Sequence, residues 1–432
     1  MNGIRPASCW RIKRLGDLGR IVTGKTPLTR VAGNFGGEIP FITPSDMDER
    51  RIIADTKRYL TQMGAASVSG FRIPQGAVMV SCIGSDMGKV AIAGCDAVTN
   101  QQINSIIVDA DISNLFIYYN LSMRKAELQH LASGGSAQPI LNKGQFSQLP
   151  ISLPELKEQR AIAHILGTLD DKIELNRRMN ETLEAIARAI FKSWFIDFDP
   201  VRAKAEGRDP GLPNHIADLF PESFENSAIG EVPSSWQIKG LDEIATFLNG
   251  LALQKYPPTN DETLPVIKIA QLRAGNSIGA DQASLDVPHE YVIQDGDLLF
   301  SWSGSLEVKI WCGGKGALNQ HLFKVTSENY PKWFYYLWIL HHLPNFRSIA
   351  AGKATTMGHI QRKHLSEAKV VVPPDALIRK CDALLSGMFD RAISSTLEAR
   401  CLSEIRDALL PKLISGELRV KDVEKFLEKE TS

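Results

Sequence analysis

One stretch near the N-terminus matches, letter for letter, the pattern of a phosphate-binding loop. Gly19–Thr26 reads Gly-Arg-Ile-Val-Thr-Gly-Lys-Thr, the G-x-x-x-x-G-K-[ST] spacing in which backbone amides and a lysine hold nucleotide phosphates. Such a loop must follow a buried strand and open a helix. The preceding segment, Arg11–Arg14, is basic, and Pro27 disfavours helical geometry at Thr26. A nucleotide-binding enzyme that uses Gly19–Thr26 is therefore the alternative interpretation and not the favoured one.

Other catalytic motifs are incomplete. Tyr256–Thr259 reads Tyr-Pro-Pro-Thr, without the acidic or Asn residue that an adenine methyltransferase places before its Pro-Pro. Glu367–Lys369 has the (D/E)-x-K letters of a nuclease, but no Pro-Asp precedes it at a useful spacing. The histidines form no H-E-x-x-H or paired-ligand pattern. The sequence therefore predicts no catalytic residues and no metal site.

Polar residues gather instead at loop positions that recur in two parts of the chain. Lys, Gln, Asn and Arg can read base edges, and Ser and Thr can bind phosphate, so these loops are candidate DNA contacts. Asn-Gln and Ser-Gly also build ordinary turns, and for any single residue that explanation is favoured. For the recurring set, DNA binding is favoured. The predicted DNA-binding residues are Lys25, Thr26, Ser85, Lys89, Gln101, Gln102, Ser136 and Gln138 in the first part, and Lys268, Gln271, Ser303, Ser305, Lys309, Gln320, His321, Lys353, Thr355 and Thr356 in the second.

The recurrence reflects a duplication of the whole chain. Trp10–Leu15 returns as Trp236–Leu241, 226 positions later (236 − 10). Asn100-Gln101 returns as Asn319-Gln320, at an offset of 219 (319 − 100). A period this long is not that of a solenoid, whose repeats span about 20–50 residues. The chain therefore consists of two homologous copies, which suggests one task performed at two places.

Each copy combines a strand-rich domain with a long helix, so the sequence predicts an α+β protein. In the first copy we expect strands at 39–43, 78–83, 90–93 and 103–108 and a helix at 115–132, and in the second copy strands at 266–269, 297–302 and 322–325 and a helix from 333. We divide the chain into a first domain (1–154), a first long helix (155–198), a Pro/Gly-rich linker with little structure of its own (199–235), a second domain (236–373), a second long helix (374–416) and a C-terminal tail (417–432).

The first long helix has an unbroken heptad pattern, which predicts that it pairs with another helix. Its seam residues are Ile162, Leu166, Leu169, Ile173, Asn176, Asn180, Leu183, Ala187, Ile190 and Trp194. The two Asn residues allow two interpretations. They fix the register of the helix pair, or they lie where the helix is exposed to solvent or contacts another protein. The second helix keeps heptad spacing from Leu377 through Cys381 and Leu384 to Met388, and Arg391 and Ser395 interrupt it. Its apolar face needs a partner, and the obvious one is the first helix.

The composition permits DNA binding without demonstrating it. The net charge is zero, but residues 1–150 carry 16 − 11 = +5 and residues 236–373 carry 13 − 12 = +1. No apolar run approaches the length of about 18 residues that a membrane span needs, and the N-terminal residues lack the apolar region of a secretion signal. The six cysteines contain no Cys-x-x-Cys pair. We therefore expect a cytoplasmic protein with reduced thiols.

Together these features resemble the specificity subunit of a type I restriction–modification system, over nearly the whole chain. The resemblance rests on the duplication, on Leu153–Ala163 (Leu-Pro-Glu-Leu-Lys-Glu-Gln-Arg-Ala-Ile-Ala) running into Leu169–Asn176, and on Phe191–Phe195 followed by Asp197–Val201. It implies two target-recognition domains held apart by two long antiparallel helices, with a pseudo-twofold relation. Each domain would read one half of an asymmetric, bipartite site in double-stranded DNA, and the helices would set the gap between the halves.

The resemblance also implies partner subunits. Two modification (methyltransferase) subunits, which carry S-adenosylmethionine and methylate adenines, would dock on the helices, and restriction subunits would bring the ATP-driven motor and nuclease with Mg²⁺. The chain itself would bind no cofactor and catalyse nothing. The predicted docking residues are Glu158, Gln159, Arg160, Ile162, Leu166 and Arg379. The second helix departs from the pattern, because in Pro374–Lys380 only Arg379 matches Arg160. Two other classes remain as alternatives: the nucleotide-binding enzyme, and a duplicated structural protein without a DNA role.

Overall fold

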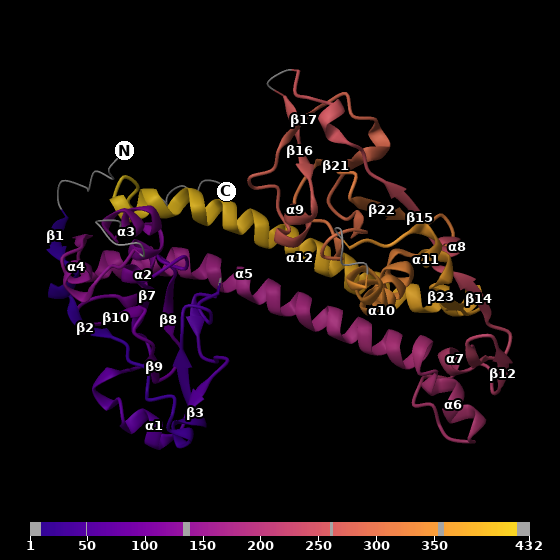
Figure 1. The fold of residues 1–432 in the computed structure, drawn as a ribbon, viewed down its shortest axis with the longest axis horizontal. Coiled ribbons are helices and arrows are strands. Elements are labelled where there is room, and N and C mark those ends of the chain that lie inside the picture. Colours follow the sequence, from indigo (N-terminus) through magenta and orange to yellow (C-terminus); the bar gives the residue numbers. More distant parts are fainter. Residues whose placement is uncertain (1–9, 49, 133–138, 260–261, 353–357, 421–432) are drawn as a thin grey trace, which may run out of the picture. The chain divides into compact units, whose positions relative to one another are not determined.

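The computed structural model describes residues 10–48, 50–132, 139–259, 262–352 and 358–420, and it divides into two compact units (Figure 1). Unit 1 consists of residues up to Leu175 and from Arg400 onward, and unit 2 of Asn176–Ala399. Each unit therefore contains one strand-rich domain, one half of the first long helix and the opposite half of the second. The predicted mixed class, with two such domains and two long helices, is confirmed.

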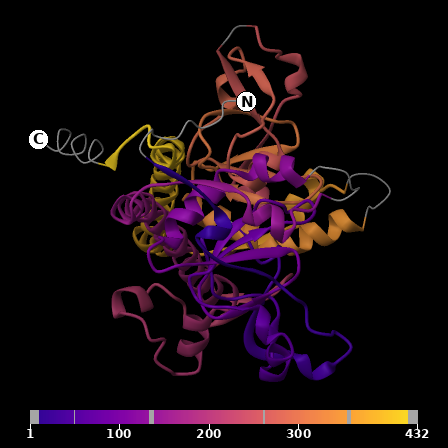
Figure 2. The same ribbon diagram turned by 90° about the vertical axis from the view of Figure 1, so that its left-hand side faces the viewer.

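The domain of unit 1, which faces the reader in Figure 2, is built on two small sheets and one pair of strands. The strand order of the larger sheet is β2 (Gly19–Thr23), β10 (Ile103–Val108), β7 (Val78–Ser81), β8 (Val90–Ala93), β4 (Ile52–Ile53). The strand order of the smaller sheet is β5 (Tyr59–Leu60), β3 (Phe35–Ile42), β9 (Ala97–Thr99), β6 (Arg72–Ile73). Separately, β1 (Arg11–Arg14) pairs with β11 (Pro150–Leu153). The helices are α1 (Gln62–Ala66), α2 (Asn114–Ser122), α3 (Lys125–Ala132) and α4 (Lys143–Ser147), with single 3-10 turns at Leu15–Asp17, Ala32–Asn34 and Ser69–Phe71.

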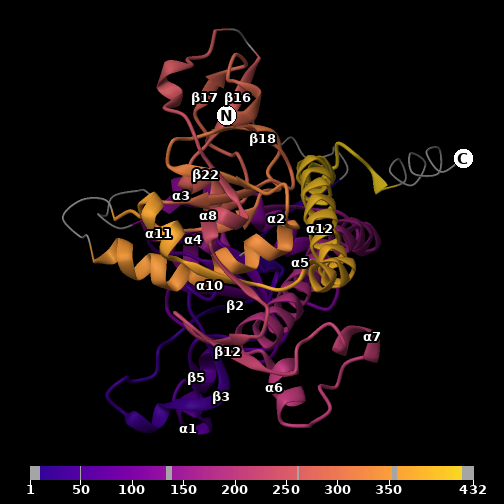
Figure 3. The ribbon, with the colours of Figure 1, turned by 90° about the vertical axis from the view of Figure 1, so that its right-hand side faces the viewer.

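The domain of unit 2 repeats this plan without a counterpart of β4 among the described residues. Its sheets have the orders β15 (Thr246–Asn249), β22 (Leu322–Thr326), β19 (Leu298–Ser301), β20 (Val308–Ile310) and β17 (Gln282–Ser284), β16 (Thr263–Ile267), β21 (Gly316–Leu318), β18 (Val292–Ile293), and β14 (Gln237–Gly240) pairs with β23 (Lys369–Val372). The helices are α8 (Leu241–Ile244), α9 (Ile269–Ala274), α10 (Lys332–Ala351) and α11 (Arg362–Glu367), with 3-10 turns at Leu253–Lys255 and His289–Tyr291. Helix α8 packs against both α10 and α11 (Figure 3).

The strands that the sequence predicts are present, and the fully apolar runs lie at the centre. All four residues of β7 are buried, and so are all four of β19, because both faces of these strands are covered. The helix predicted at 115–132 is instead two helices, α2 and α3, which meet at Arg124. The Arg124 guanidinium donates to the carbonyl of Pro150 (2.9 Å), so a contact with β11 fixes the bend.

The first long helix, α5 (Leu156–Phe191), continues into a wider π-helical turn at Lys192–Ile196. None of its ten predicted seam residues is exposed, which confirms the heptad pattern. Its partner α12 (Asp375–Ser415) runs antiparallel to it in each unit. In unit 1, Glu158 pairs with Arg419, four residues after the end of α12, and Asp170 pairs with Arg406 on α12. Partner numbers therefore fall along the second segment as they rise along α5.

In unit 2 the two seam Asn residues contact α12, which supports the register interpretation. Asn176 Nδ2 donates to Glu398 Oε2 (2.9 Å), and Asn180 Nδ2 donates to Thr396 Oγ1 (2.9 Å). The Asn176 side chain is fully buried, and its Oδ1 has no hydrogen-bond partner. A buried, half-satisfied Asn costs stability but disfavours other registers.

The heptad predicted for the second helix is wrong beyond Cys381. Leu384 is 44% exposed, while Leu385 and Phe389 are buried. The buried stripe advances by four residues at each step because this half of α12 also covers α10, where Phe389 meets the ring of Tyr336 edge-on at 5.5 Å. Ser395, expected to interrupt the apolar face, is itself buried.

The linker predicted at 199–235 is also wrong, because the segment is folded. It forms α6 (Asp199–Ala205), α7 (Asn214–Ala217) and a hairpin of β12 (Phe224–Ser227) and β13 (Gly230–Pro233). Phe198 and Phe220 are buried against Trp236, with ring centroids 5.8 and 6.3 Å apart. The Pro and Gly residues mark turns, but burying aromatic side chains contributes enough to order the chain between them.

We predict that Asn176→Leu raises the free energy of unfolding by about 1 kcal/mol, because it removes an unpaired buried oxygen from the seam. Chemical denaturation of the variant and the parent measures the change. Asn180→Leu also removes an unpaired oxygen, but from a side chain that is only partly buried, so it should raise the free energy of unfolding less. A loss of stability in Asn176→Leu would contradict this account of the seam.

A second prediction concerns acid stability. Burial lowers the pKa of His342 to about 4, although its bond to the carbonyl of Lys369 (2.9 Å) opposes the shift. In the unfolded chain the pKa is about 6.5, so the unfolded state takes up the proton first as the pH falls. This contribution to stability is complete above about pH 6.5 and declines toward pH 4. His342→Gln should flatten that decline in denaturation curves, whereas His289→Gln, at an exposed site, should leave it unchanged.

Candidate nucleic-acid interface

The two domains share one backbone hydrogen-bond frame around the recurring loops. In the first, Gly24 N donates to Ile103 O and Lys25 N to Thr99 O, and in the second Gly250 N donates to Leu322 O and Leu251 N to Leu318 O, all at 2.9–3.0 Å. These bonds bring the end of the first large-sheet strand, β2 or β15, beside the Asn-Gln turn. The duplication seen in the sequence is thus a duplication of loop geometry.

The frame requires the glycine and the asparagine that recur in both copies. A Cβ on Gly24 would lie 2.2 Å from the carbonyl oxygen of Asn100, and one on Gly250 would lie 2.3 Å from that of Asn319. Each Asn Oδ1 also accepts a backbone N–H two residues on, from Gln102 (3.1 Å) or His321 (3.2 Å). For these residues the ordinary turn explanation holds, and they shape the loop that carries their neighbours.

A second pair of bonds joins the loop after β7 or β19 to two other segments. The backbone N–H of Cys82 donates to the carbonyl of Gln102 (2.7 Å), and the carbonyl of Cys82 accepts from the N–H of Leu141 (2.9 Å). Trp302 does the same in unit 2, with His321 O (3.3 Å) and Ile360 N (2.9 Å). The backbones match, but the side chains at these positions differ, with Cys82, Gln102 and Leu141 in one domain and Trp302, His321 and Ile360 in the other. Each domain therefore presents its own set of groups on a common scaffold.

The frame also excludes the nucleotide-binding interpretation of Gly19–Thr26. Gly19–Thr23 is strand β2, which is hydrogen-bonded along its length to β10. Residues 24–31, which follow it directly, form no helix. The amides of Gly24 and Lys25 are bonded to carbonyls, so they cannot hold phosphate oxygens. The Lys25 ammonium lies 5.1 Å from the centre of the Phe71 ring.

In the first domain the structure brings together only some of the predicted DNA-binding residues. Thr26 Oγ1 donates to Gln101 Oε1 (2.7 Å) beside the exposed Lys25, and Gln102 Oε1 accepts from Asn100 Nδ2 (2.8 Å). Ser85 is exposed on the loop after β7. Lys89 instead holds this loop in place, since its ammonium contacts the carbonyl of Pro44 (3.1 Å) and the carboxylate of Asp86 (2.8 Å).

In the second domain the predicted residues separate into two groups. Ser303 Oγ lies 3.0 Å from His321 Nδ1, and Gln320 Nε2 lies 3.4 Å from His321 Nε2. The others surround α9: Lys268 pairs with Asp281, Gln271 accepts the Lys268 backbone N–H (3.3 Å), Lys309 donates to Arg273 O (2.7 Å) and Ser305 accepts from Arg273. The predicted residues Ser136, Gln138, Lys353, Thr355 and Thr356 lie outside the described residues.

Sequence reasoning missed the aromatic centre of the second loop cluster. Trp302 Nε1 donates to Asn249 Oδ1 (2.8 Å), and its ring lies 5.7 Å from that of His321 and 6.3 Å from that of His359. The offset of 226 could have found Asn249, which stands before Gly250 as Thr23 stands before Gly24. In the first domain Thr23 Oγ1 donates to Asn104 Oδ1 (2.6 Å).

The family model of the type I restriction modification DNA specificity domain matches residues 8–185 and 233–382, three-quarters of the chain and both copies. The chain belongs to this specificity family. It is 29% identical to the type I restriction enzyme MjaIX specificity subunit of Methanocaldococcus jannaschii, over 96% of this chain and 94% of that one. It is 26% identical to the HindI specificity subunit of Haemophilus influenzae, over 65% and 71%.

A solved structure shows the same fold. The S subunit of the type I restriction–modification system from M. genitalium superposes with a TM-score of 0.58 at 16% identity, covering 95% of this chain and 98% of that one. Nothing in these comparisons supports the phosphate-loop enzyme. Among the described residues of this specificity-family chain, no His, Cys, Asp and Glu side chains gather as a possible metal site, and no helix is long and apolar enough to cross a membrane.

The helices of this specificity-family member correct half of the predicted docking set. Ile162 and Leu166 are buried in the core of unit 1, so a partner cannot reach them. Gln159 is buried as well, and it accepts the backbone N–H of Ser113 (2.9 Å) and donates to the carbonyl of Pro154 (2.9 Å). Gln159 belongs to the segment Leu153–Ala163, on which the family resemblance partly rests, and its hydrogen bonds attach the first domain to α5.

The other three docking candidates lie at the surface. Arg160 and Arg379 are exposed at equivalent places near the starts of α5 and α12. Glu158 is only partly exposed and forms an ion pair with Arg419 (2.7 Å). A partner could contact the two arginines without disturbing the fold of either unit.

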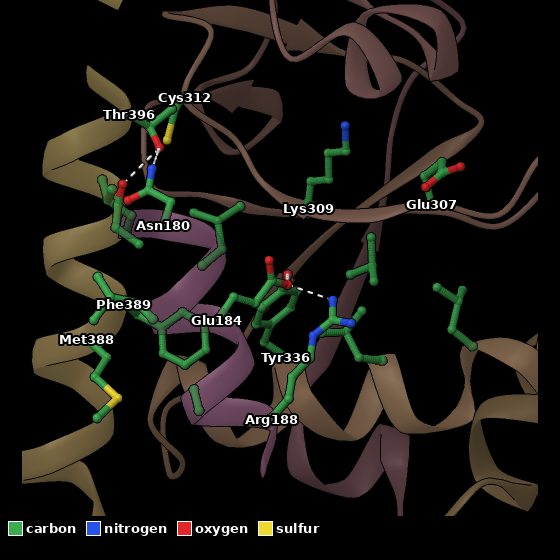
Figure 4. A pocket seen from close by; sticks show the side chains of 18 of the residues that line it. Asn180, Glu184, Arg188, Glu307, Lys309, Cys312, Tyr336, Met388, Phe389 and Thr396 are labelled. Carbon is green, nitrogen blue, oxygen red and sulfur yellow. Dashed lines mark hydrogen bonds and ion pairs between the residues drawn. The ribbon is translucent and has the colours of Figure 1, made fainter. Parts of the chain in front are cut away.

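Unit 2 of this specificity-family chain also contains a cavity of about 550 Å³, between the edge of β20 and helices α5, α10 and α12 (Figure 4). Its wall mixes apolar side chains with polar ones, among them Glu307, Lys309 and Arg347. Glu184 accepts hydrogen bonds there from Arg188 (2.6 Å) and from the hydroxyl of Tyr336 (3.2 Å). Burial raises the pKa of Tyr336, and the charge of Glu184 raises it further, so the phenol remains a donor.

We predict that Gln159→Ala lowers the free energy of unfolding of this chain by about 1–3 kcal/mol, because it leaves buried backbone groups without partners. Arg160→Ala, the adjacent exposed position, should change it by less than about 0.5 kcal/mol. Thermal and chemical denaturation of both variants test the difference. Equal effects would show that Gln159 does not tie the domain to α5.

Proposed function

We propose that this chain is the DNA-recognition subunit of a type I restriction–modification complex, in which each domain reads one half of an asymmetric, bipartite site. The observation that carries the proposal is the shared frame with unlike side chains. A common backbone frame suits one task, approach to the edges of DNA bases, and the differing groups suit two different targets.

The groups in the two frames favour different base contacts. The first domain offers the amide of Gln102, which suits an adenine edge, while Gln101 has an identical counterpart in Gln320. The second offers His321, Ser303 and the ring of Trp302, which suit an acceptor edge and an apolar contact such as the thymine methyl. Unlike groups at matching places predict a site that is not a palindrome.

The chain's partners follow from the same proposal. Double-stranded DNA lies against the loops, and two modification subunits contact α5 and α12 near the exposed Arg160 and Arg379. S-adenosylmethionine belongs to those subunits, and ATP and Mg²⁺ to restriction subunits, which agrees with the engaged amides of Gly24 and Lys25 at the one loop that matches a phosphate-binding pattern. The chain selects the DNA site at which the modification subunits act and catalyses no step itself. We place it in the cytoplasm, with the DNA that it reads.

The direct experiment is to co-express the chain with its modification subunit and map the methylated adenines of the host genome. The proposal expects a split, asymmetric motif with a fixed gap. A continuous or palindromic motif would show that only one domain reads DNA. An intact complex that methylates nothing, and that shifts no DNA in a gel, would leave a structural role for the duplicated domains.

We predict that His321→Ala relaxes the second half-site only. Loss of one good base contact costs about 1–3 kcal/mol of discrimination, which is roughly five- to 150-fold in relative methylation rate. Methylation of synthetic duplexes with single substitutions in each half measures the effect. His289→Ala, an exposed histidine elsewhere in the same domain, serves as the control and should leave both halves unchanged.

A further inference from the structure

A cluster of charged side chains joins the first domain to both long helices inside unit 1. Arg51 stands immediately before β4, and its guanidinium donates to the carbonyl of Gly167 (3.3 Å) and to Asp171 Oδ1 (2.6 Å), both on α5. It also donates to the hydroxyl of Tyr119 on α2 (3.3 Å). One side chain of the domain thus contacts the neighbouring helix α2 and the long helix α5.

Asp170 of α5 is the acceptor at the centre of this cluster. It accepts from the hydroxyl of Tyr119 (2.5 Å) and from the guanidinium of Arg406 on α12 (2.8 Å), and Arg51 lies 3.7 Å away. The Asp170 side chain is only 11% exposed and that of Arg51 only 14%. The centre of the cluster, at Asp170 and Arg51, is therefore shielded from water, where such bonds are stronger than at a surface, whereas Asp171 at its edge is 71% exposed.

The protonation states in the cluster are fixed. Burial raises the pKa of Tyr119, and the charge of Asp170 raises it further, so the phenol keeps its proton and donates. Burial alone would lower the pKa of Arg406, but the hydrogen bonds and charges of Asp170 and Asp407 together more than offset this and the pKa is raised. Donors and acceptors therefore stay in one arrangement, which favours a single geometry.

Among the described residues of unit 1, the cluster is the second of two polar attachments between the domain and α5. The first is Gln159, which holds the backbone N–H of Ser113 at the start of α2. Eleven residues separate Gln159 from Asp170, roughly 16 Å along the helix. The apolar contacts of Ile162 and Leu166 between them are not directional, so they hold the domain close without fixing its angle. Two directional attachments at separated points do fix it.

Unit 2 attaches its domain to the helices by a different cluster: Tyr336 of α10 donates to Glu184 on α5 (3.2 Å), which also accepts from Arg188 of the same helix, and no arginine of the described domain takes part. The offset of 219 places Phe389 where Asp170 stands in unit 1, and Phe389 packs against Tyr336. No described strand lies beside β20 in the way that β4 lies beside β8, and the cavity shown in Figure 4 borders that edge. Among the described residues, an arginine of the domain bonded to a long helix is found in unit 1 alone.

We propose that Arg51 is a positioning residue for the first reader. It sets the angle at which that domain leaves the helices, and through that angle the strictness with which the complex recognises the gap between half-sites. Arg51 itself contacts helix residues and not DNA. The inference rests on the proposed function, since it assumes two readers and a gap.

The test uses the full chain in complex with its modification subunit and a series of duplexes in which the gap is changed by one or two base pairs. We expect the parent to prefer one gap. Arg51→Met keeps most of the side-chain volume but removes the charge and the directional bonds. The ratio of methylation rates between the preferred gap and a gap changed by one base pair should fall about tenfold, a difference of about 1.4 kcal/mol, while the preferred bases stay the same.

Arg50→Met is the matched control. Arg50 is the adjacent residue, but it bonds to Asp48 and Asp55 within its own loop, so its loss should leave the ratio unchanged. Arg51→Lys keeps the charge and should restore part of the discrimination. A merely structural effect would lower methylation at every gap alike and would not move the ratio.

If Arg51→Met does not fold, Tyr119→Phe tests the same cluster by removing one hydroxyl, and it should lower the ratio less but in the same direction. An unchanged ratio in a folded Arg51→Met or Tyr119→Phe complex would overturn the proposal. A parent complex without any preference for a gap would instead overturn the proposed function. The two failures are therefore distinguishable.

Discussion

The structure depends on one constraint: the long helix α5 cannot bury its apolar face alone. Its 36 residues span roughly 54 Å, far more than a domain of this size can cover, and exposing the seam would cost more than an isolated helix gains. A second helix of the same chain, α12, packs antiparallel against α5 and covers this apolar face. Each half of each helix is then covered by the other helix and by one strand-rich domain, so the duplication and the helix pairing are one solution.

Within each domain a second constraint shapes the loops. Gly24 and Gly250 touch the carbonyl oxygens of an Asn-Gln turn so closely that no side chain fits. The same backbone bonds then recur around both turns, while side chains such as those of Gln102 and His321 differ. A scaffold that holds its loops by backbone bonds can change its side chains without refolding. The backbone that shapes the loops is thus separate from the side chains that would contact bases. A protein whose two domains recognise different sequences needs this separation.

The sequence predicted the parts that periodicity and duplication control. The central strands, the two long helices and the seam of α5 follow from apolar spacing, and the matching of the two copies follows from Trp10, Gly24 and their echoes. It could not separate reading residues from structural ones. Gln159 looks like a surface motif but is held inside the domain by the backbone of Ser113, and only the fold shows that Trp302 completes the cluster at His321. The segment 199–235 misled for a related reason, because Phe198 and Phe220 find their partner Trp236 only through tertiary packing.

The central claim is that each domain is an independent reader on a shared helical support. Exchanging residues 10–154 for the corresponding domain of a relative with a different target, then mapping the adenines that the complex methylates, tests it most directly. The account predicts that one half of the recognised site changes to that of the donor while the other half and the gap stay the same. A chimaera that folds and assembles but keeps both halves, or changes both, would contradict it.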